Sequence, residues 1–333
     1  MSTQLMPDWR AVVARYQVPS VARAIGQLAD TLLPLAAVLV VMYVSLSWSR
    51  WITLALSVPA AGLFVRTFII MHDCAHGSFL RQRWANEVIG YVTGLITLTP
   101  FGLWRHEHAI HHATSGDLDR RGHGDIVTLT VREYFERSRW NRLAYRLYRH
   151  PAVMLGLGPL YLVFGQRLPR LSRATGSAQN RSVWLSNAGI AIAGAAFVLV
   201  LDWKAVVWVY APAIYLSAVA GIWLFYVQHQ FDEAYWERHS RWDYPTAAVL
   251  GSSYLKLPKV LQWFTGNIGL HHVHHLGSRI PNYHLQRAHD ENPMFQQAHV
   301  LTLGQSLRLA RLALWDESRR RMVSFSEARK LAA

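Results

Sequence analysis

Four long apolar segments, almost free of charged residues, constrain the fold of this chain more than any other feature of its sequence. They lie near residues 31–48, 52–71, 183–201 and 205–227. A helix needs about 20 apolar residues to cross a bilayer, with a range of about 17–25, and each segment meets that length. Only short polar turns, at Arg50 and at Lys204, separate the members of each pair. The sequence therefore predicts an all-α integral membrane fold with four transmembrane helices in two hairpins.

Two further apolar stretches, near residues 88–104 and 151–165, are shorter and are interrupted by Gly, Pro or Thr. We expect interfacial helices here, because a single crossing at 88–104 would put the histidines before and after it on opposite sides of the membrane. Neither a repeat nor a linker divides the sequence, which predicts one domain over residues 1–333. Arg66 lies late in the second apolar segment, where it can snorkel to the interface or serve a site.

The net charge of +14 raises the question of nucleic-acid binding, because basic surfaces attract phosphate groups. Its distribution favours a membrane protein instead. The two hairpin turns carry one basic residue each, Arg50 and Lys204, while the termini and the long middle segment carry nearly all the others. Cytoplasmic loops of membrane proteins collect Lys and Arg in this way. We expect contact with membrane lipid, no nucleic-acid partner, and both termini and the middle segment on the cytoplasmic side.

Histidines gather in three clusters that follow apolar segments. One has the spacing H-x-x-x-H and two have the spacing H-x-x-H-H: His72 and His76; His108, His111 and His112; His271, His274 and His275. Residues three or four apart share one face of a helix, so each cluster can direct its imidazoles to one point. Eight convergent imidazoles are too many for one ion. The pattern predicts a site for two metal ions with an open position.

The ligand type leaves the metal open, because imidazole suits zinc, copper, iron and nickel. Zinc has no redox chemistry, so an oxygen-activating site would need iron or copper, whereas a hydrolytic site could use zinc. A histidine-rich metal transporter is a remote alternative, since its spans would carry ionisable groups along a pathway and here they carry little beyond Arg66.

Apart from His229, eight other histidines are not part of the shared pattern. His106 and His272 lie inside clusters but off the common spacing, and their role stays open. The rest are interpreted as ordinary polar residues: His123, His150, His239, His284, His289 and His299.

The residues around these clusters resemble the membrane fatty acid desaturase family. The matching stretches are HDCAHGSF at 72–79, WRHEHAIHH at 104–112 and NIGLHHVHHL at 267–276. The segment 278–283 is similar to the one that follows the third cluster in bacterial and plastid-type acyl-lipid desaturases. The resemblance implies four spans, a cytosolic cap and a non-haem di-iron centre held by the eight clustered histidines. It also implies a ninth ligand after the fourth span, where this chain has His229.

Other side chains are expected to orient these imidazoles. A ligating imidazole usually donates its second N–H to a carboxylate, a carbonyl or water. The candidates near the predicted ligands in sequence are Asp73, Asp117, Asp119 and Asp232. Asn267 is a further candidate, either for the same role or for holding a water.

The resemblance implies an oxygen-dependent desaturase that uses two Fe ions and O2 to introduce a double bond into a long acyl chain. Either an acyl lipid or an acyl thioester fits as substrate, and the bacterial character of the motifs implies a bacterial inner membrane. Cys74 is the single cysteine, so the chain has no cysteine-ligated cluster of its own. A separate electron donor, ferredoxin or a small cytochrome, is therefore implied. The alternative reading is a di-iron hydroxylase or ketolase of fatty acyl, alkane or carotenoid substrates.

Overall fold

The computed structural model describes residues 8–122, 125–168 and 176–332. Within these residues, four helices are long and apolar enough to cross a membrane. They are α2 (Val21–Ser45), α3 (Arg50–His76), α10 (Ser177–Leu201) and the stretch Trp203–His229, made of α11 (Trp203–Ala205), a π-helical turn (Val206–Tyr210) and α12 (Ala211–His229). The predicted fold of four apolar spans in two hairpins is confirmed.

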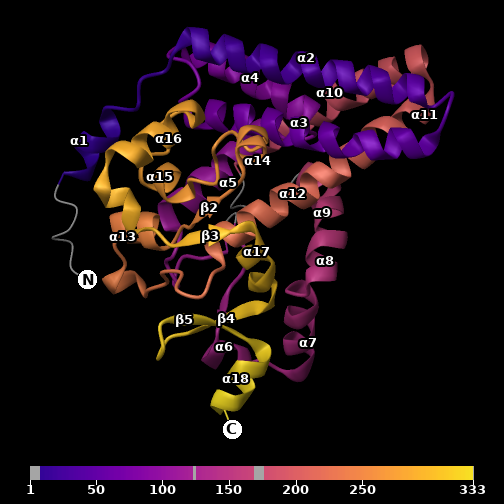
Figure 1. Cartoon of the computed structure of the whole chain (residues 1–333). Helices are drawn as coiled ribbons and strands as arrows, with labels where there is room; N and C mark the ends of the chain where they lie inside the picture. Colours follow the sequence, from indigo (N-terminus) through magenta and orange to yellow (C-terminus); the bar gives the residue numbers. More distant parts are fainter. Residues whose placement is uncertain (1–7, 123–124, 169–175, 333) are drawn as a thin grey trace.

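Helix α3 is the central helix of the membrane part. Within the protein, 61% of its most apolar stretch is buried, compared with 11% for α10. It packs against α2, α12 and α4 (Arg83–Ile96), and α2 and α3 lie side by side at the top of Figure 1. The outer spans instead expose large apolar side chains such as Leu33 and Leu199, which suits contact with lipid chains.

Two spans continue beyond their apolar segments into the histidine clusters. Helix α3 does not end at the last apolar residue but runs on through His76, and Gly77 then terminates it in a left-handed conformation (φ 65°) that suits glycine. Helix α12 likewise ends on His229 itself. The histidines at these positions are therefore fixed by the same continuous helices that form the spans.

The two shorter apolar stretches are each divided between two helices. Residues 88–104 fall in α4 and in α5 (Phe101–Thr114), and the chain turns between them where Leu98 has φ 54° and Pro100 precedes α5. Proline disfavours a helical conformation in the residue before it, which explains the break. Residues 151–165 contain α8 (Pro151–Gly156) and α9 (Gly158–Phe164).

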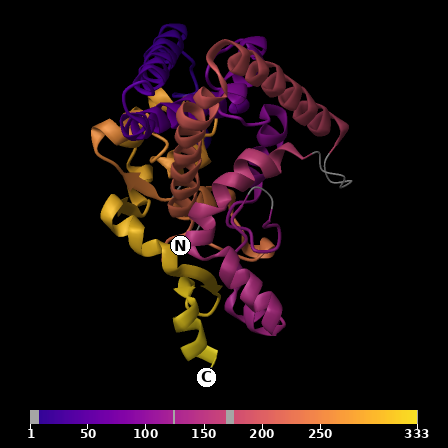
Figure 2. The ribbon, with the colours of Figure 1, turned by 90° about the vertical axis from the view of Figure 1, so that its right-hand side faces the viewer.

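Short helices and two small sheets form the rest of the protein, a cap at one end of the spans (Figure 1). The helices are α1 (Trp9–Ala14), α6 (Val131–Glu136), α7 (Arg139–Tyr148), α13 (Tyr244–Leu250), α14 (Lys259–Phe264), α15 (His271–Leu276), α16 (Asn282–Glu291), α17 (Leu303–Ser306) and α18 (Phe325–Ala332). In one sheet, β4 (Leu312–Asp316) lies between parallel β1 (Leu129–Thr130) and antiparallel β5 (Arg321–Ser324). In the other, β2 (Tyr254–Lys256) pairs in parallel with β3 (Val300–Thr302). Figure 2 shows α7 and α18 extending away from the spans.

Close packing of α4 on the start of α5 gives a first testable prediction. A Cβ atom at Gly90 would lie 2.3 Å from Cζ of Phe101, whose side chain is fully buried. Gly90→Ala should therefore destabilise the protein by about 1–3 kcal/mol, as overpacked core substitutions do. Thermal unfolding of the purified protein in detergent would show a lower midpoint. Gly26→Ala is the matched control, because no atom beyond its chain neighbours and its own helix backbone lies within 4 Å of the added Cβ. Equal midpoints for the two variants would contradict the packing.

Candidate metal centre

Four helices bring nine histidines together in the interior of the protein. The last turns of α3 and α12 supply three of them, and α5 and α15 supply the other six. Helix α5 packs against α3, and Figure 1 shows α15 on the same side of α3 as α5. These nine are the eight clustered histidines of the sequence and the predicted ninth: His72, His76, His108, His111, His112, His229, His271, His274 and His275.

The nine histidines form two groups, and in each group the candidate ligand nitrogens all lie within 4.8 Å of one another. The five-histidine group contains His72, His76, His108, His112 and His274; the four-histidine group contains His111, His229, His271 and His275. Helical spacing explains this division. Residues four apart on one helix point to the same group, while the intervening histidine of α5 or α15 points to the other.

The spacing of the nitrogens fits metal ligation. Neighbouring Nε2 atoms within the groups are 2.9 to 3.2 Å apart. Two nitrogens bound at roughly 2.1 Å to one ion and at right angles to each other are about 3.0 Å apart. The buried Nε2 of His76 also has no hydrogen-bond partner among the described residues. Both observations indicate that each group could hold one metal ion.

The electrostatic environment favours the neutral form of five of these imidazoles, which is the form that binds a metal. Burial, followed by the proximity of other imidazoles, lowers the pKa of His108, His112 and His274 well below the usual range for histidine. The same two causes lower the pKa of His271 and His275. A proton would have to enter a closely packed set of nitrogens from which water is excluded.

Three contacts occupy the Nδ1 atoms on the outer side of the groups. Nδ1 of His72 lies 3.3 Å from Oδ1 of Asp73, which sits on the same helix. Nδ1 of His229 lies 3.3 Å from the carbonyl oxygen of Gly251, and Nδ1 of His111 binds the carboxylate of Asp125. With Nδ1–H as the donor in each case, Nε2 is left with its lone pair directed into the group.

Of the orienting residues predicted from the sequence, Asp73 makes the expected type of contact. Its carboxylate also accepts hydrogen bonds from the backbone and the side chain of Asn282, at 2.7 and 2.9 Å, and so connects α3 to α16. Asn267 has a left-handed backbone (φ 60°) and donates to the carbonyl oxygen of Asn282 at 3.0 Å. It therefore supports the segment behind Asp73.

The other three predicted aspartates contact different partners. Asp117 accepts from Nδ1 of His239 at 2.7 Å, and Asp119 forms an ion pair with Arg238 at 2.9 Å. Gly116 has φ 79°, and the turn there directs the chain that follows away from α5. Asp232 is exposed. Proximity in the sequence to the histidines was thus a poor guide for these residues.

Asp125 is the orienting residue that the sequence did not predict. It lies 14 positions after His111, in a stretch without regular periodicity, and its side chain is only 7% exposed. No motif marks it. A search for every carboxylate within one loop length of a cluster would have included it, but could not have preferred it to Asp117 or Asp119.

Two aromatic residues line the five-histidine group, and one further buried histidine lies outside both groups. Trp104 stacks on His108 with ring centroids 4.3 Å apart and meets Phe68 edge-on at 5.2 Å, which gives the five-histidine group an apolar wall. His272 is fully buried but belongs to neither group, because its Nε2 lies 3.1 Å from Nδ1 of His289.

The remaining histidines among the described residues lie outside both groups as well. His106 on α5 is half-buried, and His239 pairs with an aspartate as described above. His123 lies outside the described residues.

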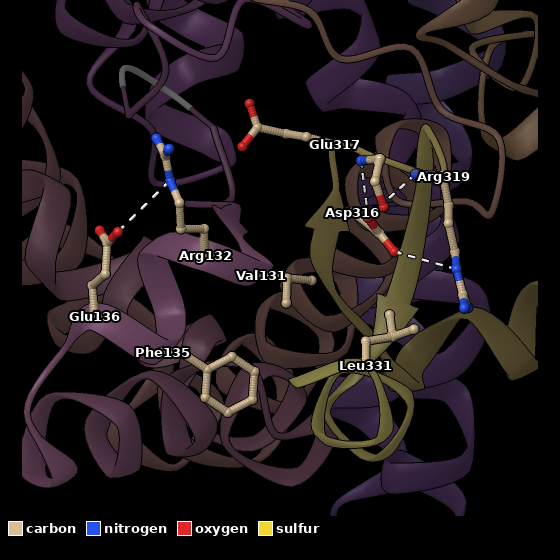
Figure 3. Close-up of a pocket in the computed structure, with 9 residues that line it drawn as sticks. Val131, Arg132, Phe135, Glu136, Asp316, Glu317, Arg319 and Leu331 are labelled. Carbon is tan, nitrogen blue, oxygen red and sulfur yellow. Dashed lines mark hydrogen bonds and ion pairs between the residues drawn. The ribbon is translucent and has the colours of Figure 1, made fainter. Parts of the chain in front are cut away.

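A pocket of about 660 Å³ lies at the far end of the cap, between α6, the β4–β5 turn and α18 (Figure 3). Its lining combines apolar residues such as Phe135 and Leu331 with the charged residues Arg132 and Glu317. None of its lining residues belongs to the helices that carry the nine histidines. It is therefore separate from the candidate metal centre.

Comparison with known proteins identifies several similar sequences. A family model described as fatty acid desaturase matches residues 46–306. Over 314 residues the chain is 44% identical to a Bacillus subtilis protein named fatty acid desaturase. The aligned residues cover 94% of this chain and 89% of that protein. It is 26% identical to the sn-1 oleoyl-lipid 12-desaturase of Anabaena variabilis, over 74% of this chain and 71% of the relative. It is 28% identical to an sn-1 acyl-lipid omega-3 desaturase (ferredoxin) of a Synechocystis species, over 68% of this chain and 63% of the relative.

Proposed function

This chain belongs to the fatty acid desaturase family, and on that premise we propose that its nine clustered histidines hold two iron ions with which it uses O2 to introduce a double bond into a long acyl chain. As a member of that family it is a membrane oxidoreductase that desaturates acyl chains. The observation that carries the proposal is the presence of two adjacent groups of buried imidazoles whose nitrogens have the spacing of metal ligands.

The five-histidine group and the four-histidine group would each hold one iron. When bound, the iron pair supplies the oxygen activation that removal of two hydrogens from unactivated methylene groups requires. The protein's own contribution is to orient the ligating imidazoles and to exclude water. Asp73 and Asp125 fix the rotation of His72 and His111 through their Nδ1 atoms. Trp104 shields the outer face of the five-histidine group.

We propose an acyl lipid as the substrate. The relatives from Anabaena and Synechocystis are named for lipid-bound acyl chains, which supports the same class here. The apolar wall formed by Trp104 and Phe68 beside the five-histidine group suits a saturated chain. A chain already dissolved in the bilayer could reach this wall without crossing water.

Electrons are proposed to come from a separate carrier on the cytoplasmic side of a bacterial inner membrane. The Synechocystis relative is named with ferredoxin, which supports a carrier of that type over a small cytochrome. Basic residues concentrate outside the hairpin turns, which supports a cytoplasmic position for the cap and for both termini. Exposed apolar side chains of α9, including Leu160 and Phe164, support a position for this helix at the lipid interface.

Product analysis tests the proposed reaction. Expressed in a bacterial host that makes only saturated phospholipid acyl chains, the protein should produce a new monounsaturated chain, detected and located by gas chromatography–mass spectrometry. Under ¹⁸O₂ the new product should carry no label, because the oxygen leaves as water. A labelled hydroxyl or keto product would instead identify a hydroxylase or ketolase, and the absence of any new product in cells that hold the iron-loaded protein would contradict the substrate class.

A further inference from the structure

Arg149 is a buried cation whose contacts are all neutral. It directly follows α7 and is 3% exposed. Its guanidinium donates to the carbonyl oxygens of Val127 and Leu312 at 3.1 and 2.9 Å, and to Oε1 of Gln230 at 2.7 Å. The ring of Tyr226 lies 5.5 Å from its Cζ. Burying a charge without a carboxylate partner is unfavourable, which requires an explanation in this position.

One series of contacts connects Arg149 to His111. Arg149 holds the carbonyl oxygen of Val127, two residues after Asp125, and Asp125 binds Nδ1 of His111. The C-terminal half of α7 reinforces the same segment. The hydroxyl of Tyr145 donates to the carbonyl of Val127 at 3.1 Å, and the hydroxyl of Tyr148 accepts from its N–H at 3.1 Å. The position of Asp125 is therefore set from α7.

A second series of contacts connects Arg149 to His229. Gln230 directly follows His229 at the end of α12, and its Oε1 accepts the shortest of the Arg149 hydrogen bonds. The side-chain amide of Gln230 also donates to Oγ1 of Thr128 at 3.2 Å, which connects the two series of contacts. The two series of contacts end at neighbouring imidazoles, since Nε2 of His111 and Nε2 of His229 lie 3.2 Å apart.

We propose that Arg149 is a positioning residue that sets the mutual orientation of His111 and His229 through Asp125 and Gln230. This inference rests on the proposed function, since it assigns Arg149 to the iron site formed by the four-histidine group. A guanidinium suits the task because its planar fork donates in several fixed directions at once, whereas a lysine ammonium is a flexible point charge. Among the described residues, none of the Arg149 hydrogen bonds reaches the five-histidine group, so its effect is confined to one of the two sites.

Iron binding by Arg149→Lys tests the inference. The full-length apoprotein in lipid nanodiscs is titrated anaerobically with ⁵⁷Fe²⁺, and each bound iron is followed by Mössbauer spectroscopy and chelator competition. The variant should lose affinity for one of its two irons by about 10–100-fold, as outer partners of metal ligands do, and retain the other. Arg139→Lys, at the exposed start of α7, is the matched control and should bind both irons as the unmodified protein does.

Gln230→Met provides a second variant, because it removes the side-chain amide that contacts Arg149 and Thr128 and leaves the carbonyl contacts of Arg149 in place. This variant should weaken binding of the same iron. It tests the positioning role on its own if Arg149→Lys does not fold. Unchanged affinity for both irons, or equal loss of both, would overturn the positioning role. So would failure of both variants to insert in the membrane, which would make Arg149 a folding residue. If the unmodified chain itself does not bind two irons, the proposed function fails first, and the two failures are thereby distinguishable.

Discussion

Replacing His274 by alanine is expected to abolish desaturation. His274 lies in the five-histidine group, and its Nε2 is 3.0 Å from that of His112. Loss of this imidazole removes a proposed ligand, so activity should fall by more than about a hundredfold, given that even the outer partners of metal ligands are worth about 10–100-fold. The measurement is the yield of unsaturated chains from the expression host, together with the iron content of the purified protein.

His272→Ala is the matched control for that experiment. His272 lies two residues away in the same cluster and is fully buried, but it contacts His289 and belongs to neither group. Its loss should lower the thermal midpoint while two irons per chain are retained. If His272→Ala and His274→Ala lost iron equally, the division of the histidines into ligands and supporting residues would be wrong.

Replacing Asp125 by asparagine is expected to weaken one iron site selectively. The substitution keeps the shape of the side chain but removes the charge that binds Nδ1 of His111. The proposed site around the four-histidine group should lose affinity for Fe²⁺ by about 10–100-fold, with a similar loss of activity. Anaerobic titration of the apoprotein with Fe²⁺, read against a chelator of known affinity, measures the change.

Asp117→Asn is the control for Asp125→Asn. Asp117 is fully buried and close to the second histidine cluster in sequence, but its carboxylate binds His239 rather than any of the nine histidines. Iron affinity should stay at the unmodified level in this variant, even though its stability falls. Loss of iron in Asp117→Asn and retention in Asp125→Asn would reverse the assignment made from the geometry.

The spans and the histidine set were predictable because both depend on short-range helical spacing. A long apolar segment must form a helix in a bilayer, since no other open structure satisfies its backbone there. Residues three or four apart on such helices then share a face, whatever the rest of the fold does. The placement of His229 came from the family resemblance, not from spacing, because it stands alone at the end of its helix.

The surroundings of the site were not predictable in the same way. Asp125 reaches His111 only because α7 holds the irregular segment after residue 125, and nothing in the local sequence encodes that distant contact. The same reasoning applies to Arg149, whose partners come from three separate parts of the chain. Aspartates near the cluster in sequence were preferred, but the turn at Gly116 carries Asp117 and Asp119 elsewhere.

The continuity of α3 and α12 with the metal centre has a structural consequence. The histidines at their ends are carried by helices that the bilayer holds in place, whereas those of α5 and α15 come from helices outside the spans. Each group combines histidines of both origins. Assembly of the site therefore requires the cap to pack correctly on the spans, which makes iron retention a sensitive report of that packing.

The most direct test of the account is an experimental structure of the iron-loaded protein with anomalous scattering measured on both sides of the iron absorption edge. We predict two iron peaks per chain, one among the Nε2 atoms of the five-histidine group and one among those of the four-histidine group. A single peak, peaks bound by other residues, or a signal at the zinc edge in their place would contradict it.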